Sequence, residues 1–398
     1  MISNKAIKYL SVIMILGSIS CKKEIKKENQ TIKIIVKNNL PEKRNFETIE
    51  LTKEILKLTE SDSLENYSIV ESKTNKKLLS QLVDLNSDGI ADQLLFQPEI
   101  NGNSEVAFNL ILDKNKNNST PLRVFSRFVP ERFDDYAWEN DRVAFRTFGP
   151  KIQQMAENNI EGGTISNGID CWLKKVEYPI INKWYRANMI EPGAYHKDSG
   201  EGLDSYHVGS SLGCGGTAIR SEENFYSSEN FISFNTITVG PIRTQFQLNY
   251  KNWDVNGRDI SEKKIITLDY GNNLSKFDVS ISGTNEILAG LTLHDKKGEI
   301  TEDPKNYFTT YWEPHDDSYL GTAIIALPQY FNTASKNIVA TPDKSHALVH
   351  LNILKNKTIY YSGFGWKEAG RYTSKEDWNE YILRFSKQLQ NPLTFNIK

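Results

Sequence analysis

The sequence predicts a mainly β protein built from two β-sandwiches, and two observations lead to this prediction. Aromatic residues make up 11% of the 398 residues. Apolar and polar residues also alternate in short runs, and each run ends at or near Asn, Gly, Asp or Pro, as half-buried antiparallel strands do. The clearest runs are TIKIIVKN, LILDKN, RVAFRTFG, FISFNTITVG, RTQFQLNY, KIITLDY and KFDVSISG.

Helical patterns are limited to two segments. The first covers residues 48–59, and the second is SKEDWNEYILRFSKQL near the C-terminus. In the second segment Asp377 follows Ser374 by three residues, which is close to a capping box. No repeat of fixed period is present, so a propeller or a solenoid is not expected.

The polar stretch KNKNNST, from Lys114 to Thr120, divides the strand-rich sequence into two parts. We expect residues 31–115 to form a small β-sandwich and residues 121–398 to form a large one. A chain of this length with 38% hydrophobic residues exceeds the usual size of one domain, which agrees with two domains.

The N-terminus, MISNKAIKYLSVIMILGSISCKKE, has the pattern of an export signal. Its apolar run, Tyr9 to Leu16, is shorter than the roughly 20 residues that a membrane-spanning helix needs. Small residues precede Cys21, as in bacterial lipoproteins. We therefore expect a signal peptide at residues 1–20, lipidation of Cys21, a tether at residues 21–30, and a location in the bacterial outer membrane. A plain secretory signal is the alternative.

Charge and cysteine content exclude some partners. The formal net charge is −2, and nucleic-acid-binding domains are usually strongly basic, so no nucleic acid partner is expected. Contact with the membrane is expected only through the lipid anchor.

Cys171 and Cys214 do not have the spacing of a metal site. Two interpretations of these cysteines remain open: they form a disulfide, or they are two buried free thiols.

The segment DLNSDGIADQLLFQ places oxygen ligands at alternating positions, as in a calcium loop. The closing Glu of an EF-hand is missing, because Leu95 occupies its position. One interpretation is a structural calcium ion, and the other is an Asx-type turn without metal. The candidate ligands are Asp84, Asn86, Asp88 and Asp92.

Two further segments carry candidate functional groups. VPERFDDYAWENDRVAFRTFGP combines carboxylates with Trp138, which suits a carbohydrate cleft or, alternatively, a solvated strand edge. YHKDSGEGLDSYHVGSSLGCGG places two histidines directly after tyrosines in a Gly-rich loop. Functional groups often gather on such loops, although a plain surface loop is the alternative. His294, Trp312 and His315 lie in separate segments without metal-binding spacing.

Five segments resemble a bacterial family known as domain of unknown function 4861. These are VPERFDDYAWENDRVAFRTFGP, GIDCWLKKVEYPIINKWY, YHKDSGEGLDSYHVGSSLGCGG, TVGPIRTQFQLNY and YYSGFGWKEAGRYTSKEDWNEYI. The resemblance implies a small β-domain followed by a large galactose-mutarotase-like β-supersandwich. It also implies an oligosaccharide dehydratase that acts on the non-reducing-end glucuronic or iduronic acid of ulvan-type, rhamnose-3-sulfate oligosaccharides. The product is a 4,5-unsaturated uronic acid, and no cofactor is needed.

Such a β-elimination needs a base, an acid and a cation that offsets enolate charge. From this chemistry we expect His207 as base or acid, with Tyr206 or Tyr195 as its counterpart and His196 nearby. The groups expected to bind the carboxylate or the sugar are Arg146, Lys174, Lys175, Trp138, Glu139, Trp312 and His315.

Three other functions remain open. A polysaccharide lyase would expel a bridging oxygen instead of a hydroxyl. A glycoside hydrolase would use two carboxylates, for example Glu139 and Asp204, and would release a reducing sugar. A non-catalytic glycan-binding surface lipoprotein would do neither.

Overall fold

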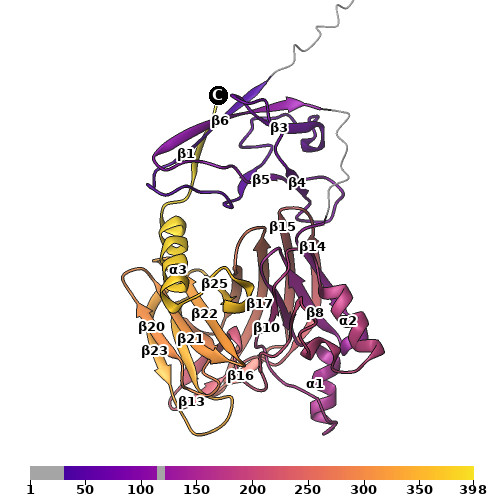
Figure 1. Ribbon diagram of the computed structural model, residues 1–398, viewed down its shortest axis with the longest axis vertical. Coiled ribbons are helices and arrows are strands. Elements are labelled where there is room, and N and C mark those ends of the chain that lie inside the picture. The colour runs from indigo at the N-terminus through magenta and orange to yellow at the C-terminus, as the bar shows by residue number, and fades with distance from the viewer. Residues whose placement is uncertain (1–30, 114–121) are drawn as a thin grey trace, which may run out of the picture.

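The computed structural model describes residues 31–113 and 122–398. Figure 1 shows a small N-terminal module stacked on a larger β part, with α3 beside their junction. The predicted signal peptide, Cys21, the tether and the whole predicted seam at residues 114–120 lie outside the described residues. Within the described ranges, no helix is long and apolar enough to cross a membrane.

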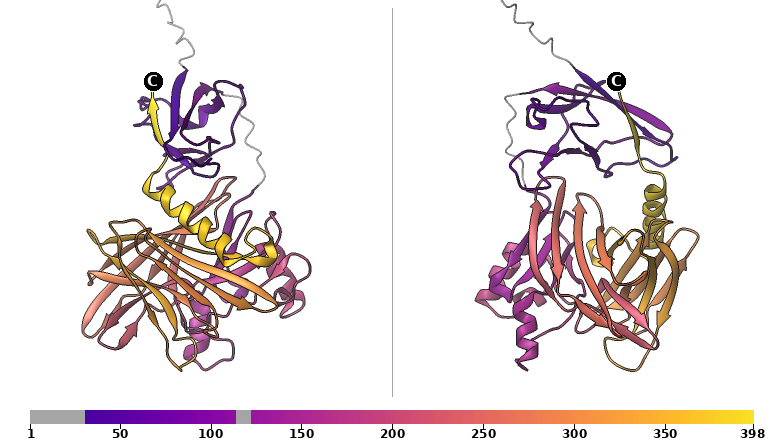
Figure 2. Two further views of the ribbon diagram at one scale, coloured as in Figure 1. Left: turned by 60° about the vertical axis from the view of Figure 1, so that its left-hand side comes forward. Right: turned by 180° about the vertical axis from the view of Figure 1, so that it is seen from behind.

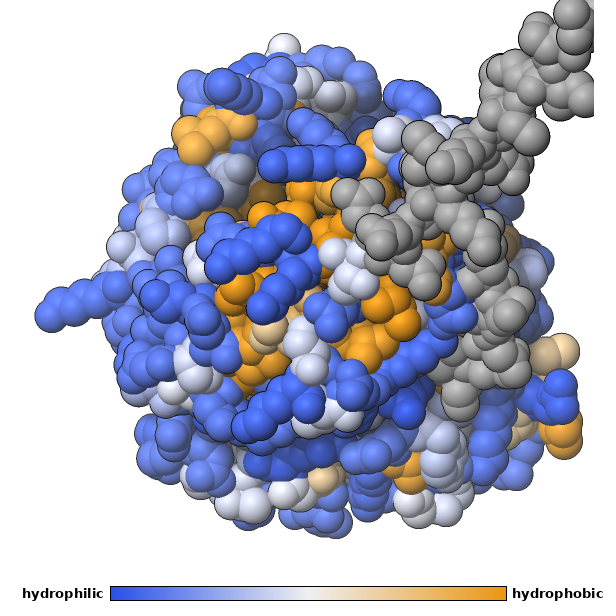
Figure 3. Space-filling view, turned by 90° about the horizontal axis from the view of Figure 1, so that it is seen from above, coloured by the Kyte–Doolittle hydropathy of each residue, from blue (hydrophilic) through white to orange (hydrophobic). Residues whose placement is uncertain are grey.

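The N-terminal module consists of two small antiparallel sheets. The four-stranded sheet has the order β26 (Thr394–Ile397), β1 (Ile32–Asn38), β6 (Ser104–Leu112) and β3 (Tyr67–Glu71). The three-stranded sheet has the order β2 (Ile49–Leu51), β5 (Gln93–Phe96) and β4 (Ser80–Val83), and a 3-10 turn, η1 (Leu64–Asn66), precedes β3. One apolar cluster fills the space between these sheets. From above, the module shows hydrophobic residues gathered in the middle of its face and hydrophilic residues around them (Figure 3).

The C-terminal strand changes the expected domain boundary. We assigned residues 121–398 to the large domain, but β26 pairs with β1, for example Ile397 with Ile34. The chain therefore returns to the N-terminal module after α3, and both ends of the described chain lie in one sheet (Figure 2).

The large part contains three antiparallel sheets. The nine-stranded sheet runs β14 (Phe231–Thr238), β15 (Arg243–Tyr250), β17 (Arg258–Asp269), β18 (Leu274–Ser282), β25 (Lys357–Trp366), β22 (Ser318–Ala326), β21 (Phe308–His315) and β20 (Glu299–Asp303), with β16 (Trp253–Val255) paired to β17. One five-stranded sheet runs β13 (Asn224–Tyr226), β12 (Cys214–Ser221), β19 (Glu286–Thr292), β24 (His346–Asn352) and β23 (Phe331–Asn337). The other runs β11 (Gly202–Leu203), β10 (Asp170–Lys174), β9 (Ala144–Thr147), β8 (Asp135–Glu139) and β7 (Phe125–Val129). The largest apolar core contains side chains from all three sheets.

The prediction of a mainly β protein is confirmed, because several antiparallel sheets make up most of the described chain. The alternation of RTQFQLNY produces β15 itself, whose inward residues Phe246 and Leu248 are fully buried. Cys171 and Cys214 are buried free thiols, which is one of the two interpretations left open.

The described residues form three α-helices, and the sequence predicted one of them. The predicted C-terminal helix is α3 (Lys375–Gln390), where the Ser374 side chain accepts a hydrogen bond from the Asp377 backbone. The helix predicted at residues 48–59 is wrong: β2 and turns occupy this segment, because Ile49 and Leu51 bury alternate side chains against β5. Short, less periodic helices were not predicted: α1 (Pro150–Glu157), α2 (Ile181–Ile190), and the 3-10 turns η2 (Pro130–Arg132), η3 (Ala194–His196) and η4 (Lys367–Ala369).

Candidate functional site

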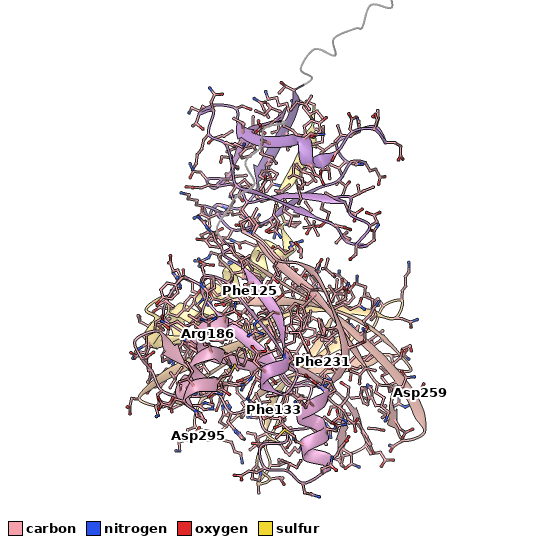
Figure 4. All side chains as sticks on the ribbon, turned by 90° about the vertical axis from the view of Figure 1, so that its right-hand side faces the viewer. Phe125, Phe133, Arg186, Phe231, Asp259 and Asp295 are labelled. Atoms are coloured by element: carbon pink, nitrogen blue, oxygen red, sulfur yellow. The ribbon has the colours of Figure 1, made fainter. Side chains whose placement is uncertain are left out.

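Five polar and aromatic residues from distant segments meet at one end of the large part. His294 follows β19, Glu313 and His315 end β21, and Tyr206 and His207 lie in the loop between β11 and β12. We call this group the histidine rim. It lies on the side of the large part away from the N-terminal module, as the position of Asp295, the residue after His294, shows in Figure 4.

His294 is held by two acceptors. Its Nδ1 lies 2.7 Å from Oε1 of Glu313, and its Nε2 lies 2.8 Å from the backbone oxygen of His207. A carbonyl and an ionised carboxylate can only accept, so with Glu313 ionised both ring nitrogens donate and the ring is an imidazolium. Burial raises the pKa of Glu313, and the contact with His294 opposes this rise. Burial opposes this charge, but Glu313 and the His207 carbonyl outweigh it and raise the pKa of His294 above its ordinary value.

His315 has the opposite electrostatic character. Its Nε2 lies 2.9 Å from Oγ of Ser205, and its ring centre lies 6.2 Å from that of His294. Burial lowers the pKa of His315, and the positive charge of His294 adds to this effect while Asp316 opposes it. The His315 side chain is 10% exposed. His315 is therefore a neutral imidazole near neutral pH and can accept a proton.

Tyr206 and His207 complete the histidine rim. The Tyr206 ring packs edge-on against His294 at 4.6 Å between ring centres, and burial raises its pKa well above the ordinary value, so it is a neutral phenol. The His207 side chain is 67% exposed, and its Nε2 lies 3.2 Å from Oδ1 of Asp343. The predicted pair Tyr206 and His207 thus lies beside two histidines from other strands.

A second, buried cluster surrounds Arg146 on β9. Its guanidinium lies 2.6 Å from Asp170, 3.0 Å from Asp204 and 3.8 Å from Asp135. These carboxylates come from β10, from the segment after β11, and from β8. Asp204 is two residues before Tyr206, so one short segment connects this cluster with the histidine rim.

The three carboxylates outnumber the one guanidinium at their centre. Burial raises the pKa of Asp170 to about 7 and that of Asp135 to about 6, and it also raises the pKa of Asp204. Burial opposes the charge of Arg146, yet the carboxylates outweigh it and raise the pKa of Arg146. Arg146 pairs with all three carboxylates through its Nη atoms, so its role is to hold the loop that carries Asp204.

Tyr195 and His196 lie at the edge of this cluster. The Tyr195 hydroxyl accepts hydrogen bonds from Arg132 Nε at 3.2 Å and Arg146 Nη1 at 3.5 Å, and the residue is 5% exposed. The His196 side chain is 55% exposed, and its Nδ1 lies 2.5 Å from the backbone oxygen of Asp204. Of this predicted pair, His196 is therefore the one open to a ligand.

Lys175 is the accessible cation among those predicted to bind a carboxylate. Its Nζ lies 2.5 Å from Asp198 and 5.1 Å from the centre of the Trp366 ring, and its side chain is 28% exposed. A lysine over an aromatic ring gains a cation–π attraction, which helps to hold the Lys175 ammonium in place. Lys175 thus remains a candidate for contact with an acidic group.

Three other predicted contact residues are buried. Lys174 Nζ donates to Glu139 Oε2 at 2.8 Å, and both side chains are 0% exposed. Glu139 also accepts from the backbone N–H groups of Ile180 and Ile181 at the start of α2. Trp138 is fully buried and donates to Ser275 Oγ. Burial removes Lys174, Glu139 and Trp138 from the groups that can touch a sugar, and their contacts are structural.

The predicted aromatic Trp312 lies on the other face of β21, toward α3. It is 7% exposed and packs in the cluster that contains Trp378. Tyr319 stacks on it at 5.9 Å and is itself 40% exposed. Tyr319 is therefore the more accessible ring of this pair.

The predicted calcium loop has the geometry of an Asx-type turn. The Asp84 carboxylate accepts hydrogen bonds from the backbone N–H groups of Asn86, Ser87 and Gly89. Asp88 and Asp92 likewise accept from backbone N–H groups of the loop. Among the described residues no group of three or more His, Cys, Asp or Glu side chains is arranged to hold a metal ion. The turn, one of the two interpretations left open, thus accounts for these side chains.

Sequence reasoning missed the pairing of His294 with Glu313. His294 stood alone in the sequence, and Glu313 was not singled out. A signal was present, because Tyr311, Glu313 and His315 alternate along one strand and so share one face. The strand that brings His294 to this face belongs to a different sheet, which the sequence does not reveal.

Comparisons with known proteins agree with the resemblance found in the sequence. The family described as "Domain of unknown function (DUF4861)" matches residues 36–395. "Uncharacterized protein P7" of Formosa agariphila is 50% identical over 376 residues, which are 94% of this chain and 95% of that protein.

Two solved structures resemble the fold. A glycosyl hydrolase family 38 protein from Enterococcus faecalis matches with a TM-score of 0.52 and 13% identity, over 92% of this chain and 47% of that one. An alpha-mannosidase from Enterococcus faecalis V583 matches with a TM-score of 0.50 and 12% identity, over 92% and 46%. The chain thus spans about half the length of these solved proteins, and at this identity the likeness concerns the fold alone.

Proposed function

This chain belongs to the DUF4861 family, and we propose from the chemistry of its histidine rim that it is a carbohydrate-active dehydratase. The proposed substrate is the non-reducing-end glucuronic or iduronic acid of an ulvan-type, rhamnose-3-sulfate oligosaccharide. The proposed product is a 4,5-unsaturated uronic acid. The family resemblance implies this substrate class, and the rim supports the type of reaction.

One observation carries the proposal: a neutral imidazole, His315, lies next to an imidazolium, His294, with 6.2 Å between the ring centres. A β-elimination from a uronic acid needs both forms. A base removes the proton from carbon 5, next to the carboxylate, and a cation offsets the charge of the enolate that forms. Two histidines with pKa values shifted in opposite directions supply these roles near one pH.

The atoms balance without a cofactor. His315 takes the carbon 5 proton, the carbon 4 to oxygen bond breaks, and a double bond forms between carbons 4 and 5. An acid protonates the departing oxygen, which leaves as water. His207 suits this role because it is exposed and paired with Asp343. Tyr206 is 4% exposed, as buried as Tyr195, so His207 is the proposed acid. Lys175 is the proposed cation for an acidic group of the sugar, because its side chain is 28% exposed.

The fold likeness supports a finer fold assignment. We propose that the large part is a galactose-mutarotase-like β-supersandwich, as the family resemblance implies. Three antiparallel sheets around one core and the likeness to carbohydrate-active proteins agree with this proposal.

The location proposed from the sequence is the bacterial outer membrane, with the lipid on Cys21. The support is the signal pattern before Cys21. Mass spectrometry of the membrane-extracted protein should find a lipidated N-terminal cysteine. A Cys21→Ala variant should lack the lipid and leave the membrane fraction, and a variant that stays there would contradict the proposal.

The activity is tested by incubating the protein with ulvan oligosaccharides and measuring two quantities, the ultraviolet absorbance and the amount of reducing sugar. Elimination produces the ultraviolet band of an unsaturated uronate, whereas hydrolysis releases a reducing sugar without the band. Water loss without chain cleavage identifies a dehydratase, and the band together with a shorter chain identifies a lyase. Binding with neither signal would favour a glycan-binding protein and contradict the proposal.

Single variants assign the roles. We expect His315→Ala and His207→Ala each to lower the rate by about 10² to 10⁴ fold, as loss of a general acid or base does. His350→Ala is the matched control, because His350 also pairs with a glutamate, Glu286, but lies on β24 outside the rim. Parent rates in both rim variants would overturn the assignment.

A further inference from the structure

A cleft of about 660 Å³ separates the N-terminal module from the large part. Its walls come from residues 42–50 of the module, from β17 and β18 of the large part, and from α3. Figures 1 and 2 show α3 beside this junction, at the end of the large part opposite to the histidine rim. Ligand pockets usually measure about 300 to 1,000 Å³ and occur often between domains. The cleft is thus large enough for a sugar residue.

Most of the charged side chains that line the cleft form ion pairs, but some of the cationic ones do not. Arg243 binds Asp269 and Glu50, at 2.7 and 2.6 Å. In contrast, Lys276 and Arg384 are in no ion pair within residues 31–113 and 122–398. Six cationic and four anionic side chains line the cleft. The excess positive charge therefore favours an anionic ligand.

Arg142, a third cation of the cleft, is only weakly paired. Its Nε lies 3.7 Å from Asp141, is buried and makes no hydrogen bond within the described chain, and its Nη1 donates to Asn273 Oδ1 at 3.3 Å. Its guanidinium lies 5.0 Å from the centre of the Phe46 ring. A partly buried guanidinium with free donor capacity is suited to a carboxylate or a sulfate group.

Aromatic rings provide the other half of the lining. Phe385 of α3 packs edge-on against Tyr361 of β25 at 5.6 Å between ring centres, and both rings are partly exposed in the cleft. Sugar rings pack their C–H faces on aromatic side chains, and their acidic groups need cations. The lining combines both requirements.

We propose that this cleft is a second binding site, which holds an acidic sugar residue of an oligosaccharide away from the histidine rim. The substrate class rests on the proposed function. Lys276 and Arg384 bind the acidic group, and Phe385 with Tyr361 packs against the ring. This second site holds the oligosaccharide on the protein and takes no part in the elimination.

The test measures binding by isothermal titration in the His315→Ala background, so that turnover does not interfere. The probe is a sulfated glucuronate-rhamnose tetrasaccharide, and maltotetraose and sodium sulfate are the comparison ligands. We expect Lys276→Met with Arg384→Met to abolish one of two binding events or to weaken it at least about tenfold, because charge-assisted contacts are the strong ones. The matched control is Arg220→Met with Lys336→Met, which removes the same charge from exposed positions elsewhere.

Each outcome decides the proposal. The proposal is supported if the cleft variant loses one binding event and the control variant keeps both. This result does not depend on whether the parent protein shows turnover, so it is separate from the test of the dehydratase. Unchanged binding in the cleft variant overturns it. If sulfate binds as tightly as the tetrasaccharide does, the proposal is also overturned, because the cleft would then be a site for a small anion. Equal binding of maltotetraose would show that charge plays no part and would overturn it as well.

Discussion

His294 lies just after β19 and Glu313 lies on β21, a strand of a different sheet 19 positions further on, yet their side chains meet at 2.7 Å. The Glu313 side chain is 1% exposed and the His294 side chain is 18% exposed. This pairing fixes the charge of the ring that we propose to stabilise the enolate. The charge state of the histidine rim therefore depends on a residue that does not need to touch the substrate.

The Glu313→Gln variant tests this dependence through the pH profile of kcat/KM. For the parent we expect a bell: activity falls on the acid side as His315 gains a proton and on the alkaline side as His294 loses one. Gln can still accept a hydrogen bond but carries no charge, so the raised pKa of His294 should fall and the alkaline limb should move to lower pH. Glu286→Gln, the partner of His350, should leave both limbs in place. An unmoved alkaline limb in Glu313→Gln would show that His294 is not the group that titrates there.

The Glu139→Gln variant separates a structural carboxylate from a hydrolytic one. Glu139 and Lys174 are both fully buried, and removing one partner of such a pair costs about 3 to 5 kcal/mol of unfolding free energy. We expect urea denaturation to show this loss. The control is Glu177→Gln, whose exposed pair with Arg371 should contribute little. A stable but inactive Glu139→Gln protein would instead favour the hydrolase alternative.

The Asp170→Asn variant tests the carboxylate cluster around Arg146. Burial raises the pKa of Asp170 to about 7 in the folded protein, so the folded state binds a proton more tightly than the unfolded state. The resulting stability is complete below the unfolded pKa of about 3.9 and is lost as the pH rises through about 7. We expect the loss of unfolding free energy between pH 4.5 and 8 to be smaller in Asp170→Asn than in the parent. An equal loss in both proteins would assign this pH dependence to other groups.

The loop around Asp84 gives a test by metal addition. The carboxylate already accepts three backbone N–H groups, and these hydrogen bonds, the one from Gly89 first, lower the pKa of Asp84. We therefore expect calcium to leave the melting temperature unchanged. Asp84→Ala should lower that temperature equally with and without calcium. A calcium-dependent rise in the parent that disappears in the variant would establish a metal site.

The sequence predicted the sheets better than the site. Alternation in RTQFQLNY and KFDVSISG sufficed for β15 and β18, because each strand buries one face against the core. Charge and residue type could not distinguish the exposed Lys175 from the fully buried Lys174 beside it. That difference depends on α2, whose first N–H groups bind Glu139, the partner of Lys174. The sequence also placed two tyrosine-histidine pairs in one loop, but the strands around the loop put them in separate clusters.

The pairing of β26 with β1 has a consequence for synthesis in the cell. β1 leaves the ribosome long before residues 394–397, which cover one edge of it. Until then the N–H and C=O groups along that edge are a template for pairing with other chains. A variant that lacks residues 394–397 would leave this edge of β1 open and should aggregate more readily than the parent.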